Sequence, residues 1–402
     1  MKRDDLTHAV RERLKRLPPP YEAHYGVVPL QPPEESVPLQ AIATRLSAAA
    51  AVLARIDTIA SSLKDPFLIS RILPRREAVS SSSIEGTNST LDELLSVEET
   101  GAAEAQDAAV QVRDYALALD EVIPRARAEK HAIFTVDLVK ELHKKVMAGD
   151  SAYKDTPGEL RSRVVWIGGG GHIAYSTYNP APPEDIAPSL EQTISYMRCD
   201  GMQAQTQSLV VRMAIAHSHF EAVHPFRDGN GRVGRLLLPL MMAAEGHTPL
   251  YLSPYIETRK NAYYASLKAA QQKLNWEEAV GFLADAIVGS ADELLVTRSA
   301  LTELGQIWRK RRKFREGSAA LKSLDQLAHY PVLTIKRLAD LLAVSFPAAS
   351  QAVEQLIEAG ILVERTGYER NRVFAAPEAL MIINRPFGET PILPEKTVSP
   401  GK

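Results

Sequence analysis

The chain has 402 residues, of which 45% are apolar and 24% charged, with 47 Lys and Arg against 49 Asp and Glu. This composition excludes disordered and fibrous proteins, and the length allows two or three domains. The longest nearly unbroken apolar run, residues 236–244, is too short for a transmembrane helix, which needs about 20 residues. The near balance of charge argues against a protein that coats nucleic acid through bulk charge.

The N-terminus and the cysteine content indicate a cellular compartment. Residues 1–17 mix basic and acidic side chains and lack the apolar centre of a secretory signal. The single cysteine, Cys199, allows no intramolecular disulfide and is most simply a small filler residue. We therefore expect a cytoplasmic protein without a membrane partner.

The first half of the chain has a proline-rich leader followed by helical patterns. Seven prolines between residues 18 and 38 disfavour a helix and predict an extended segment that packs on another part of the chain. Apolar residues then recur at three- and four-residue steps over residues 39–56, and again over 106–147, where Thr135 is a plausible N-cap. The body of the protein is predicted to be predominantly α-helical.

One stretch departs from the helical pattern. Residues 163–173 run through four β-prone or aromatic side chains into four glycines, residues 168–171. This pattern predicts a short hairpin with a mobile tip, which we name the flap. Another helix is expected to open near Asp185.

The C-terminal part has its own pattern. Six basic residues lie between Arg309 and Arg315, and a domain boundary is expected near Gly317. Two short helices are predicted at residues 334–342, with Thr334 as N-cap, and at 347–359, followed by a strand, a turn at Gly367 and a second strand within 361–374. This order matches a winged helix-turn-helix. Residues 386–402 are expected to form a loosely ordered tail.

The stretch that indicates chemistry is residues 224–235, predicted as a loop between helices at 209–223 and 236–244. Two glycines allow close approach of a ligand, amides at a helix start favour anions, and Arg232 and Arg235 share a helix face. Asp228 could hold Mg²⁺ against phosphates, and His224 supplies a base that titrates near neutral pH. Together these features favour phosphoryl or nucleotidyl transfer. The stretch reads His224-Pro225-Phe226-Arg227-Asp228-Gly229-Asn230-Gly231-Arg232-Val233-Gly234-Arg235.

This stretch resembles the signature of Fic-domain proteins, His-x-Phe-x-Asp/Glu-Gly-Asn-Gly-Arg-x-x-Arg, at every fixed position. The resemblance continues upstream in Ala216-His217, Phe220-Glu221 and Pro157-Gly158-Glu159. A second family element, Ser/Thr-x-x-x-Glu-Gly/Asn, corresponds to residues 81–86, which run from Ser81 through Glu85 to Gly86. It is typical of Fic proteins with a built-in inhibitory helix.

The resemblance implies a protein adenylyltransferase that moves AMP from ATP to a Ser, Thr or Tyr hydroxyl of a target protein, or of itself, and releases pyrophosphate. His224 would be the catalytic base, Asp228 would hold Mg²⁺, and Phe226 would be a buried anchor. The nucleotide would contact a set of residues in and after the signature. These are Gly229, Asn230 and Gly231 in the anion hole, Arg232 and Arg235 on the phosphates, the intervening Val233 and Gly234, and Tyr263, Tyr264 and Gln271 near the adenosine, where relatives often have Asn instead of Gln271.

The resemblance also implies regulation and target binding. Glu85 would form a bidentate pair with Arg235 and occupy the position of the γ-phosphate, so that ATP binds unproductively. In some relatives the same glutamate positions a water that removes AMP, so de-AMPylation is the alternative. The flap edge, Val165, Trp166, Ile167 and Gly168, would add the target segment as an extra strand.

Other interpretations remain open. His217, His219 and His224 could be metal ligands, but a two-residue step on a helix points His217 and His219 to different faces, which favours ordinary helix histidines. A DNA-binding regulator with the Fic core as nucleotide sensor is a second class of function, supported by the basic residues 309–315 and by Arg365, Arg370 and Arg372 in the wing. The predicted recognition helix, residues 347–359, has Glu354 and Glu358 but no Lys or Arg, which favours dimerisation or target docking instead. A kinase-like or phosphocholine-transferring Fic variant is a further alternative, although the intact signature favours AMP.

The expected fold is mainly α: a helical Fic core with a small β-hairpin flap, plus a C-terminal winged helix-turn-helix. The expected divisions are an N-terminal helical region with the inhibitory motif (1–105), the catalytic core (106–316), the winged helix (317–385) and the tail (386–402). Expected partners are ATP and an unknown target protein, with a second copy of the chain as an open alternative.

Overall fold

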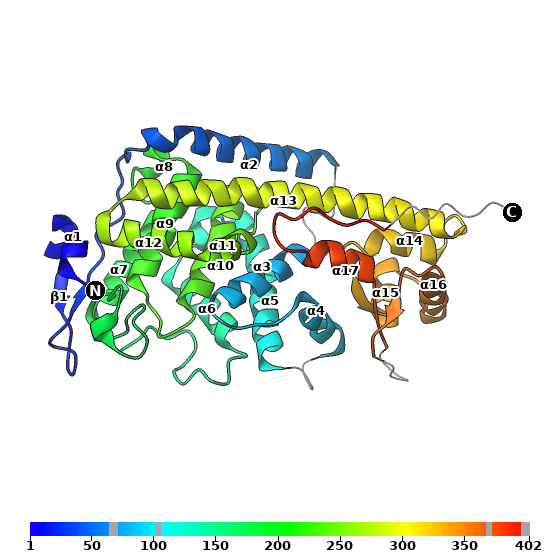
Figure 1. Cartoon of the computed structure of the whole chain (residues 1–402), viewed down its shortest axis with the longest axis horizontal. Coiled ribbons are helices and arrows are strands. Elements are labelled where there is room, and N and C mark those ends of the chain that lie inside the picture. The colour runs from blue at the N-terminus through cyan, green and yellow to red at the C-terminus, as the bar shows by residue number, and fades with distance from the viewer. Residues whose placement is uncertain (64–70, 102–105, 367–371, 395–402) are drawn as a thin grey trace.

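The computed structural model describes residues 1–63, 71–101, 106–366 and 372–394, and most of them are helical (Figure 1). Among the described residues, no helix is both long and apolar enough to span a membrane. The helices of the first half are α1 (His8–Glu12), α2 (Ala43–Leu63), α3 (Ile72–Ile84), α4 (Leu91–Thr100), α5 (Asp107–Glu129), α6 (Val136–Met147), α7 (Ile186–Arg198), α8 (Gln203–Thr206) and α9 (Leu209–Val223).

The helices of the second half and the short strands complete the fold. The later helices are α10 (Asn230–Ala244), α11 (Ser253–Thr258), α12 (Lys260–Lys273), α13 (Trp276–Arg311), α14 (Ala319–Gln326), α15 (Ile335–Leu342), α16 (Phe346–Glu358) and α17 (Pro377–Asn384). The strands are β1 (Leu14–Arg16), β2 (Tyr25–Val27), β3 (Val332–Thr334), β4 (Val363–Glu364) and β5 (Val373–Ala375).

Helices α9 and α10 form the centre of the core. Every residue of α9 from Val210 to Val223 is buried, and α10 packs against α9, α5, α6 and α3. Because α9 has neighbours on all sides, its sequence is apolar nearly all round instead of amphipathic. The segment between α9 and α10, which carries the signature, is therefore fixed at both ends by buried helices.

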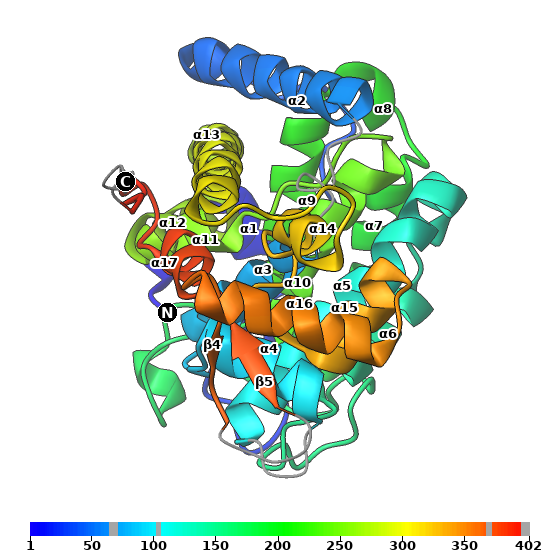
Figure 2. The same cartoon turned by 90° about the vertical axis from the view of Figure 1, so that its right-hand side faces the viewer.

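Two long helices cover one side of this core. Helix α13 runs along the length of the molecule, and α2 lies beside it, as Figures 1 and 2 show. Arg45, near the start of α2, donates to the carboxylate of Asp285 on α13 at 2.9 Å, which joins the two helices. The prediction of a helix over residues 39–56 is confirmed, and the helix continues to Leu63.

The N-terminal segment packs on the core as a strand pair and an extended run. Strands β1 and β2 are antiparallel, with Leu14 opposite Val27, and this hairpin was not predicted. Of the proline-rich leader predicted to be extended, residues 18–24 instead form the turns of this hairpin, and residues 28–38 run on without helix or strand. The Gln207 side chain donates to the backbone carbonyls of Pro33 and Glu35 at 2.8 and 2.9 Å, which fixes this run against the helical body.

The C-terminal unit contains the predicted helix, turn, helix, strand and strand. Thr334 caps α15 by accepting from the N–H of Arg337, and the antiparallel sheet has the order β3-β5-β4. Helices α14 and α17 and strand β3 are additional elements. The predicted turn at Gly367 and the wing residue Arg370 lie outside the described residues.

Two irregular segments differ in detail from the prediction. Within the described flap, residues 163–173, the predicted hairpin is reduced to one antiparallel bridge between Ile167 and Tyr178. Positive φ angles at three consecutive glycines, residues 168–170, turn the chain away from a strand. In the tail, residues 386–394 are held in place instead of loose. The N–H of Gly388 donates to Glu293 at 3.3 Å, and Phe387 packs edge-on against Tyr255 at 5.7 Å. Residues 395–402 lie outside the described part.

Candidate active site

The signature is divided between a short loop and the start of α10. Residues 230–235 were expected in the loop but form the first turns of α10, which begins at Asn230. His224 at φ 49° ends α9, and Gly229 at φ 77° precedes α10, so left-handed residues bound a loop of six. Glycine adopts this conformation without strain. The first amides of α10 have no acceptor within the helix and no side-chain cap, which makes this end an anion site.

Buried side chains on both sides hold the loop. The Asn230 side chain accepts from the N–H of Phe226 at 2.9 Å and donates to its carbonyl at 2.8 Å. His143 of α6 stacks on the Phe226 ring with centroids 3.7 Å apart, donates to the carbonyl of Asp228 at 3.0 Å and accepts from the N–H of Gly158 at 2.8 Å. Burial lowers the pKa of His143 to about 4, so the ring is neutral and has one tautomer. The Asn230 side chain is thus engaged by the loop, and its backbone N–H remains for an anion.

Arg161 ties the base of the flap to the same loop. Its guanidinium donates to the backbone carbonyls of His224, Arg163 and Ala181 at 2.8 to 2.9 Å. Its own N–H donates to the carbonyl of Pro225 at 2.9 Å. Burial lowers the pKa of Arg161 to about 10, which still leaves the side chain charged at neutral pH. Flap and loop therefore form one rigid unit around His224.

His224 lies at the junction of α9 and the loop with a neutral imidazole. Burial, assisted by the positive charge of Arg161, lowers the pKa of His224 to about 4, although Glu85 acts in the opposite direction. A neutral ring at physiological pH can accept a proton, as a general base must.

Glu85 and Ser81 hold Arg235 at the start of α10. Arg235 is 1% exposed, and its Nη2 lies 2.7 Å from Oε1 of Glu85. Its Nε donates to the Ser81 hydroxyl at 2.9 Å and its Nη2 to the Ser81 carbonyl at 2.8 Å. The expected bidentate pair is instead a single ion contact to Glu85 plus two bonds to Ser81. Gly86, at φ 90°, follows Glu85 where α3 ends.

The Glu85 carboxylate lies directly on the backbone of α10. A side-chain carbon at Gly231 would meet Oε1 of Glu85 at 2.1 Å, so only glycine permits this approach. Burial would raise the pKa of Glu85, but Arg235 and the more distant Arg232 outweigh it, and the pKa lies below its usual value. The glutamate is therefore an anion, placed where the helix amides and Arg235 meet.

Arg232 and Asp228 lie on the other side of the helix start. Arg232 is 3% exposed and donates to Gln111 at 3.4 Å and to the sulfur of Met147 at 3.0 Å, while its Nε is buried without a partner among the described residues. Asp228 is exposed, and one of its oxygens accepts from the N–H of Gly229 at 2.6 Å. One exposed carboxylate beside an anion site suits Mg²⁺, which takes one or two carboxylates together with substrate phosphates.

The residues expected near adenosine are not in one place. Tyr263 is 3% exposed, and its hydroxyl bonds to Nε2 of His217 at 2.8 Å, so its ring belongs to the core. Tyr264 is 42% exposed, with its ring 5.3 Å from that of Tyr263. Gln271 lines a separate hollow with Val27 and other residues. Tyr264 and Gln271 remain predicted contacts.

The buried face of α10 explains two further signature residues. Val233 is fully buried, so only its backbone could take part in binding. Gly234 lies against α9, where a side-chain carbon would meet Oε1 of Glu221 at 2.5 Å. His217 donates to the Gly234 carbonyl at 3.1 Å, and His219 pairs with Thr193 at 2.8 Å, as expected of ordinary helix histidines.

Among the described residues, one other group could hold a metal ion: His131, Cys199 and Glu245, at the far end of α10. Glu245 already forms an ion pair with Arg212, and His131 lies 2.9 Å from the same carboxylate. These contacts satisfy the group as an ordinary polar cluster.

Comparisons with known proteins match two regions of the chain to one family. Residues 43–123 match the N-terminal region of the Fic/DOC family, and residues 133–242 match the Fic/DOC family itself. Over these two regions the chain therefore resembles Fic/DOC family proteins, with the N-terminal family region followed by the Fic region. A solved Fic family protein from Desulfovibrio desulfuricans G20 aligns with 86% of this chain and 98% of its own, with a TM-score of 0.52 at 19% identity, which supports the mainly α Fic fold.

Two named relatives share parts of the sequence. The protein adenylyltransferase fic-1 of Caenorhabditis briggsae is 32% identical over 143 residues, which are 36% of this chain and 25% of the relative. The protein adenylyltransferase Fic of Drosophila yakuba is 27% identical over 222 residues, which are 55% of this chain and 41% of the relative. The chain thus matches between a quarter and about two fifths of the length of these relatives.

Proposed function

We propose that this protein transfers AMP from ATP to a hydroxyl group of a target protein. The observation that carries the proposal is the position of Glu85: an anion that contacts Arg235 and lies against the α10 backbone at Gly231, near a neutral His224. A site that holds a carboxylate there has the charge and the donors for a phosphate. The names of the relatives, protein adenylyltransferases, favour AMP as the group transferred.

Each residue then has a chemical role. His224 takes the proton of the target hydroxyl as its oxygen attacks the α-phosphorus of ATP. The bond between that phosphorus and the bridging oxygen breaks, and pyrophosphate leaves. The amides of α10, Arg232 and Arg235 stabilise the charge on the phosphates, and Asp228 would hold Mg²⁺, which neutralises part of that charge.

The flap supplies a backbone edge for the target. Residues 164–166 are partly exposed and run extended beside the bridge of Ile167 with Tyr178. Trp166 is fixed by its indole N–H, which donates to the carbonyl of Gly170 at 3.1 Å. A target segment that pairs with this edge would bring its hydroxyl towards His224, because Arg161 fixes the flap to the His224 loop.

Glu85 inhibits AMP transfer in the conformation described here, in which it contacts Arg235. Its carboxylate occupies the Arg235 guanidinium, which a γ-phosphate would need, and both cannot bind there because the two anions repel each other. ATP could still enter, but its phosphates would be displaced from the position for attack.

Three variants test the proposal. Glu85→Gly should raise the transfer of label from α-labelled ATP to protein by at least tenfold, since it removes one charge-assisted contact worth about 1.5 to 3 kcal/mol. His224→Ala and the double variant Glu85→Gly/His224→Ala should show no transfer. Equal labelling by wild type and Glu85→Gly would refute the inhibitory role. Label from γ-labelled ATP would identify a kinase-like reaction, and release of AMP from labelled protein by wild type but not by Glu85→Gly would identify the reverse reaction.

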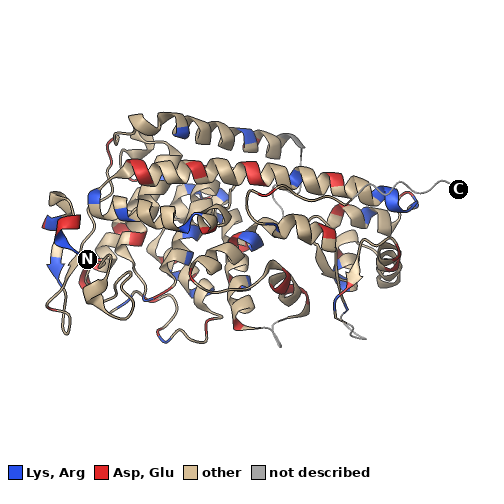
Figure 3. Ribbon diagram, viewed as in Figure 1, with Lys and Arg blue, Asp and Glu red and all other residues tan. Residues whose placement is uncertain are grey.

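We also infer that residues 317–385 are a winged helix-turn-helix that contacts protein, not DNA. Basic residues gather at the end of α13 (Figure 3), and some of them are paired with acidic ones: Arg311 with Glu378 at 2.5 Å, and Arg312 with Glu358 of α16. In the wing, Arg372 pairs with Glu364. Paired arginines release few counterions from DNA, so retention on DNA at 150 mM salt would contradict this inference.

A further inference from the structure

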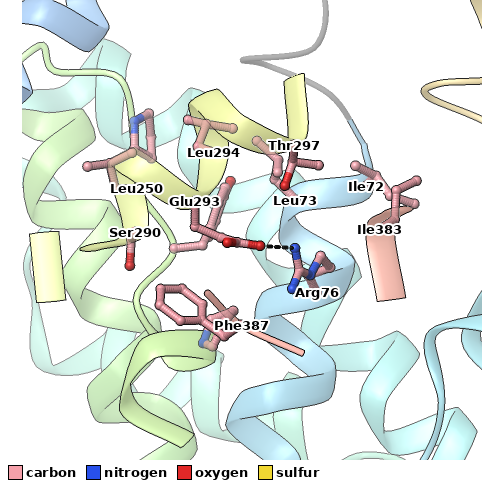
Figure 4. Close-up of a pocket in the computed structure, with 13 residues that line it drawn as sticks. Ile72, Leu73, Arg76, Leu250, Ser290, Glu293, Leu294, Thr297, Ile383 and Phe387 are labelled. Carbon is pink, nitrogen blue, oxygen red and sulfur yellow. Dashed lines mark hydrogen bonds and ion pairs between the residues drawn. The ribbon is translucent and has the colours of Figure 1, made fainter. Parts of the chain in front are cut away.

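A small hollow lies between α3, α11, α13 and α17, away from the signature. Its volume is about 40 Å³. Its walls are apolar and come from four parts of the chain, as Figure 4 shows: Ile72, Leu250, Leu294, Ile383 and Phe387. Arg76 of α3 and Glu293 of α13 meet in the middle of these walls (Figure 4).

The charges in the hollow are unequal. Glu293 is 9% exposed and serves two guanidinium groups: Oε1 lies 2.8 Å from Arg385 and 3.5 Å from Arg76. Arg385 is further satisfied by Thr297 and by the carbonyl of Ile382, both at 2.8 Å. Arg76 has the weaker contact. Burial and the neighbouring Arg385 lower its pKa despite Glu293, with Glu257 as a more distant counter-charge.

A second polar group faces the hollow without a partner. Ser290 is 7% exposed, and its hydroxyl is buried and has no hydrogen bond within the described residues. A buried hydroxyl without a partner is costly unless something else occupies the space beside it. The hollow therefore combines apolar side chains with two polar groups: the Arg76 guanidinium, which has one long ion contact, and the Ser290 hydroxyl, which has no hydrogen bond within the described residues.

We propose that this hollow binds a small carboxylate with a branched apolar body, whose carboxylate contacts Arg76 and Ser290 while its alkyl group packs on Leu294 and Phe387. An anion is favoured because the Arg76 guanidinium has only a long 3.5 Å contact to Glu293, whose same oxygen lies 2.8 Å from Arg385. A branched alkyl group suits the walls, and the limited volume restricts the ligand to a few carbon atoms.

Such a ligand would stabilise the inhibited state, a step that rests on the proposed function. Arg76 lies on α3, the helix that ends at Glu85. The hollow exists here with Glu85 on Arg235, and a ligand that binds this state shifts the population towards it. Two other contacts hold α3 in the position that places Glu85 on Arg235, and the ligand would add to them. Arg75 pairs with Glu98 at 2.8 Å, and Glu77 accepts from the Ser253 hydroxyl at 2.6 Å.

Binding is tested first, with 3-methylbutanoate as the probe and the neutral 3-methylbutanamide as its matched control. In titrations of the full chain followed by methyl NMR, the carboxylate should bind in the millimolar range, as its size allows, and the amide roughly tenfold more weakly. Arg76→Gln should reduce carboxylate binding by about tenfold, and Leu294→Trp, which fills the hollow, should abolish it. Equal binding of acid and amide, or binding unaffected by Arg76→Gln, would overturn the site.

Regulation is tested separately. In wild type, 3-methylbutanoate should slow hydrogen exchange in residues 72–84 and lower the residual AMP transfer. The Glu85→Gly variant should also bind the probe, but its own, higher rate of transfer should be the same with and without the probe. Equal inhibition of both proteins, or exchange unchanged at saturating probe, would overturn the regulatory step while leaving the site intact. An inactive Glu85→Gly would contradict the proposed function and leave the binding result standing.

Discussion

The Nη2 atom of Arg235 lies 2.7 Å from a carboxylate oxygen of Glu85, although the two residues are 150 positions apart in the chain. Arg235 is 1% exposed, whereas the Glu85 side chain is 30% exposed, so the pair is closed on the arginine side and open on the glutamate side. Glu85 also follows the last residue of α3. Any change that releases the end of α3 should therefore open the anion site on α10.

Lys260 is the residue best placed to show this coupling without altering the pair. Its ammonium donates to the carbonyl of Ile84, the last residue of α3, and favours the negative end of that helix. Lys260→Met should raise AMP transfer by about three- to tenfold, the value of one charge-assisted hydrogen bond, and less than Glu85→Gly does. Initial rates with α-labelled ATP measure the effect.

The matched control for Lys260 lies on the same helix. Lys268 of α12 is exposed, so Lys268→Met removes the same charge from a surface that does not contact α3. It should leave the rate within twofold of wild type. A similar rise in both variants would show that net charge, and not the end of α3, controls the rate.

The pH dependence of the reaction should reflect the lowered pKa of His224. In the Glu85→Gly variant the counter-charge that raises this pKa is absent, so the value should be no higher than about 4. The pH profile of kcat/KM reports the ionisation of the free enzyme. The value of kcat/KM should therefore change by less than twofold between pH 5.5 and 7.5. An ordinary histidine, with a pKa near 6.5, would instead lose about tenfold at pH 5.5. A tenfold loss would thus show that the ring is solvated.

The sequence predicted the residues that would carry the chemistry better than the residues that hold the loop in place. The positions of His224, Arg235 and Glu85 follow from motifs, and the helices before and after the loop follow from apolar periodicity. The roles of His143 and Arg161 do not, because each binds backbone carbonyls or amides far away in the chain, which leave no pattern in side-chain spacing.

The flap and the start of α10 show the same limit. The β-prone residues before the glycines predicted a hairpin, but positive φ angles at residues 168–170 allowed one bridge only. Helix α10 begins earlier than its apolar run because Gly229 sets the turn and the buried Asn230 side chain bonds to the backbone of Phe226, four residues earlier in the loop. Closely spaced polar residues in a signature can thus be helical.

Glu221 should make folding stability fall as pH rises. It is fully enclosed beside Gly234, one of its oxygens is buried without a partner among the described residues, and burial raises its pKa to about 8. The unfolded chain releases this proton near pH 4.5, whereas the folded chain keeps it until about pH 8. Its contribution to stability is therefore complete below pH 4.5 and lost between pH 4.5 and 8.

Glu221→Gln removes this titration and tests the sign. The drop in Tm between pH 5 and 8 should be smaller for Glu221→Gln than for wild type, as followed by far-UV circular dichroism. Glu316→Gln, at an exposed position, is the control and should keep the wild-type drop. If Glu221→Gln and Glu316→Gln give the same pH dependence, the Glu221 carboxyl is ionised in the folded protein.

Two helical glycines should respond in opposite ways to alanine. At Gly234 a side-chain carbon would meet Oε1 of Glu221 at 2.5 Å and the Phe220 ring at 3.1 Å, so Gly234→Ala must force α9 and α10 apart and should cost about 1 to 3 kcal/mol. At Gly305 of α13 the same carbon would meet only the mobile end of Arg309 at 3.3 Å. Gly305→Ala should therefore raise stability by about 0.5 to 1 kcal/mol, the difference in helix propensity. Urea unfolding measures both, and a Gly234→Ala variant as stable as Gly305→Ala would mean that α9 and α10 are less tightly packed around the anion site than the structure indicates.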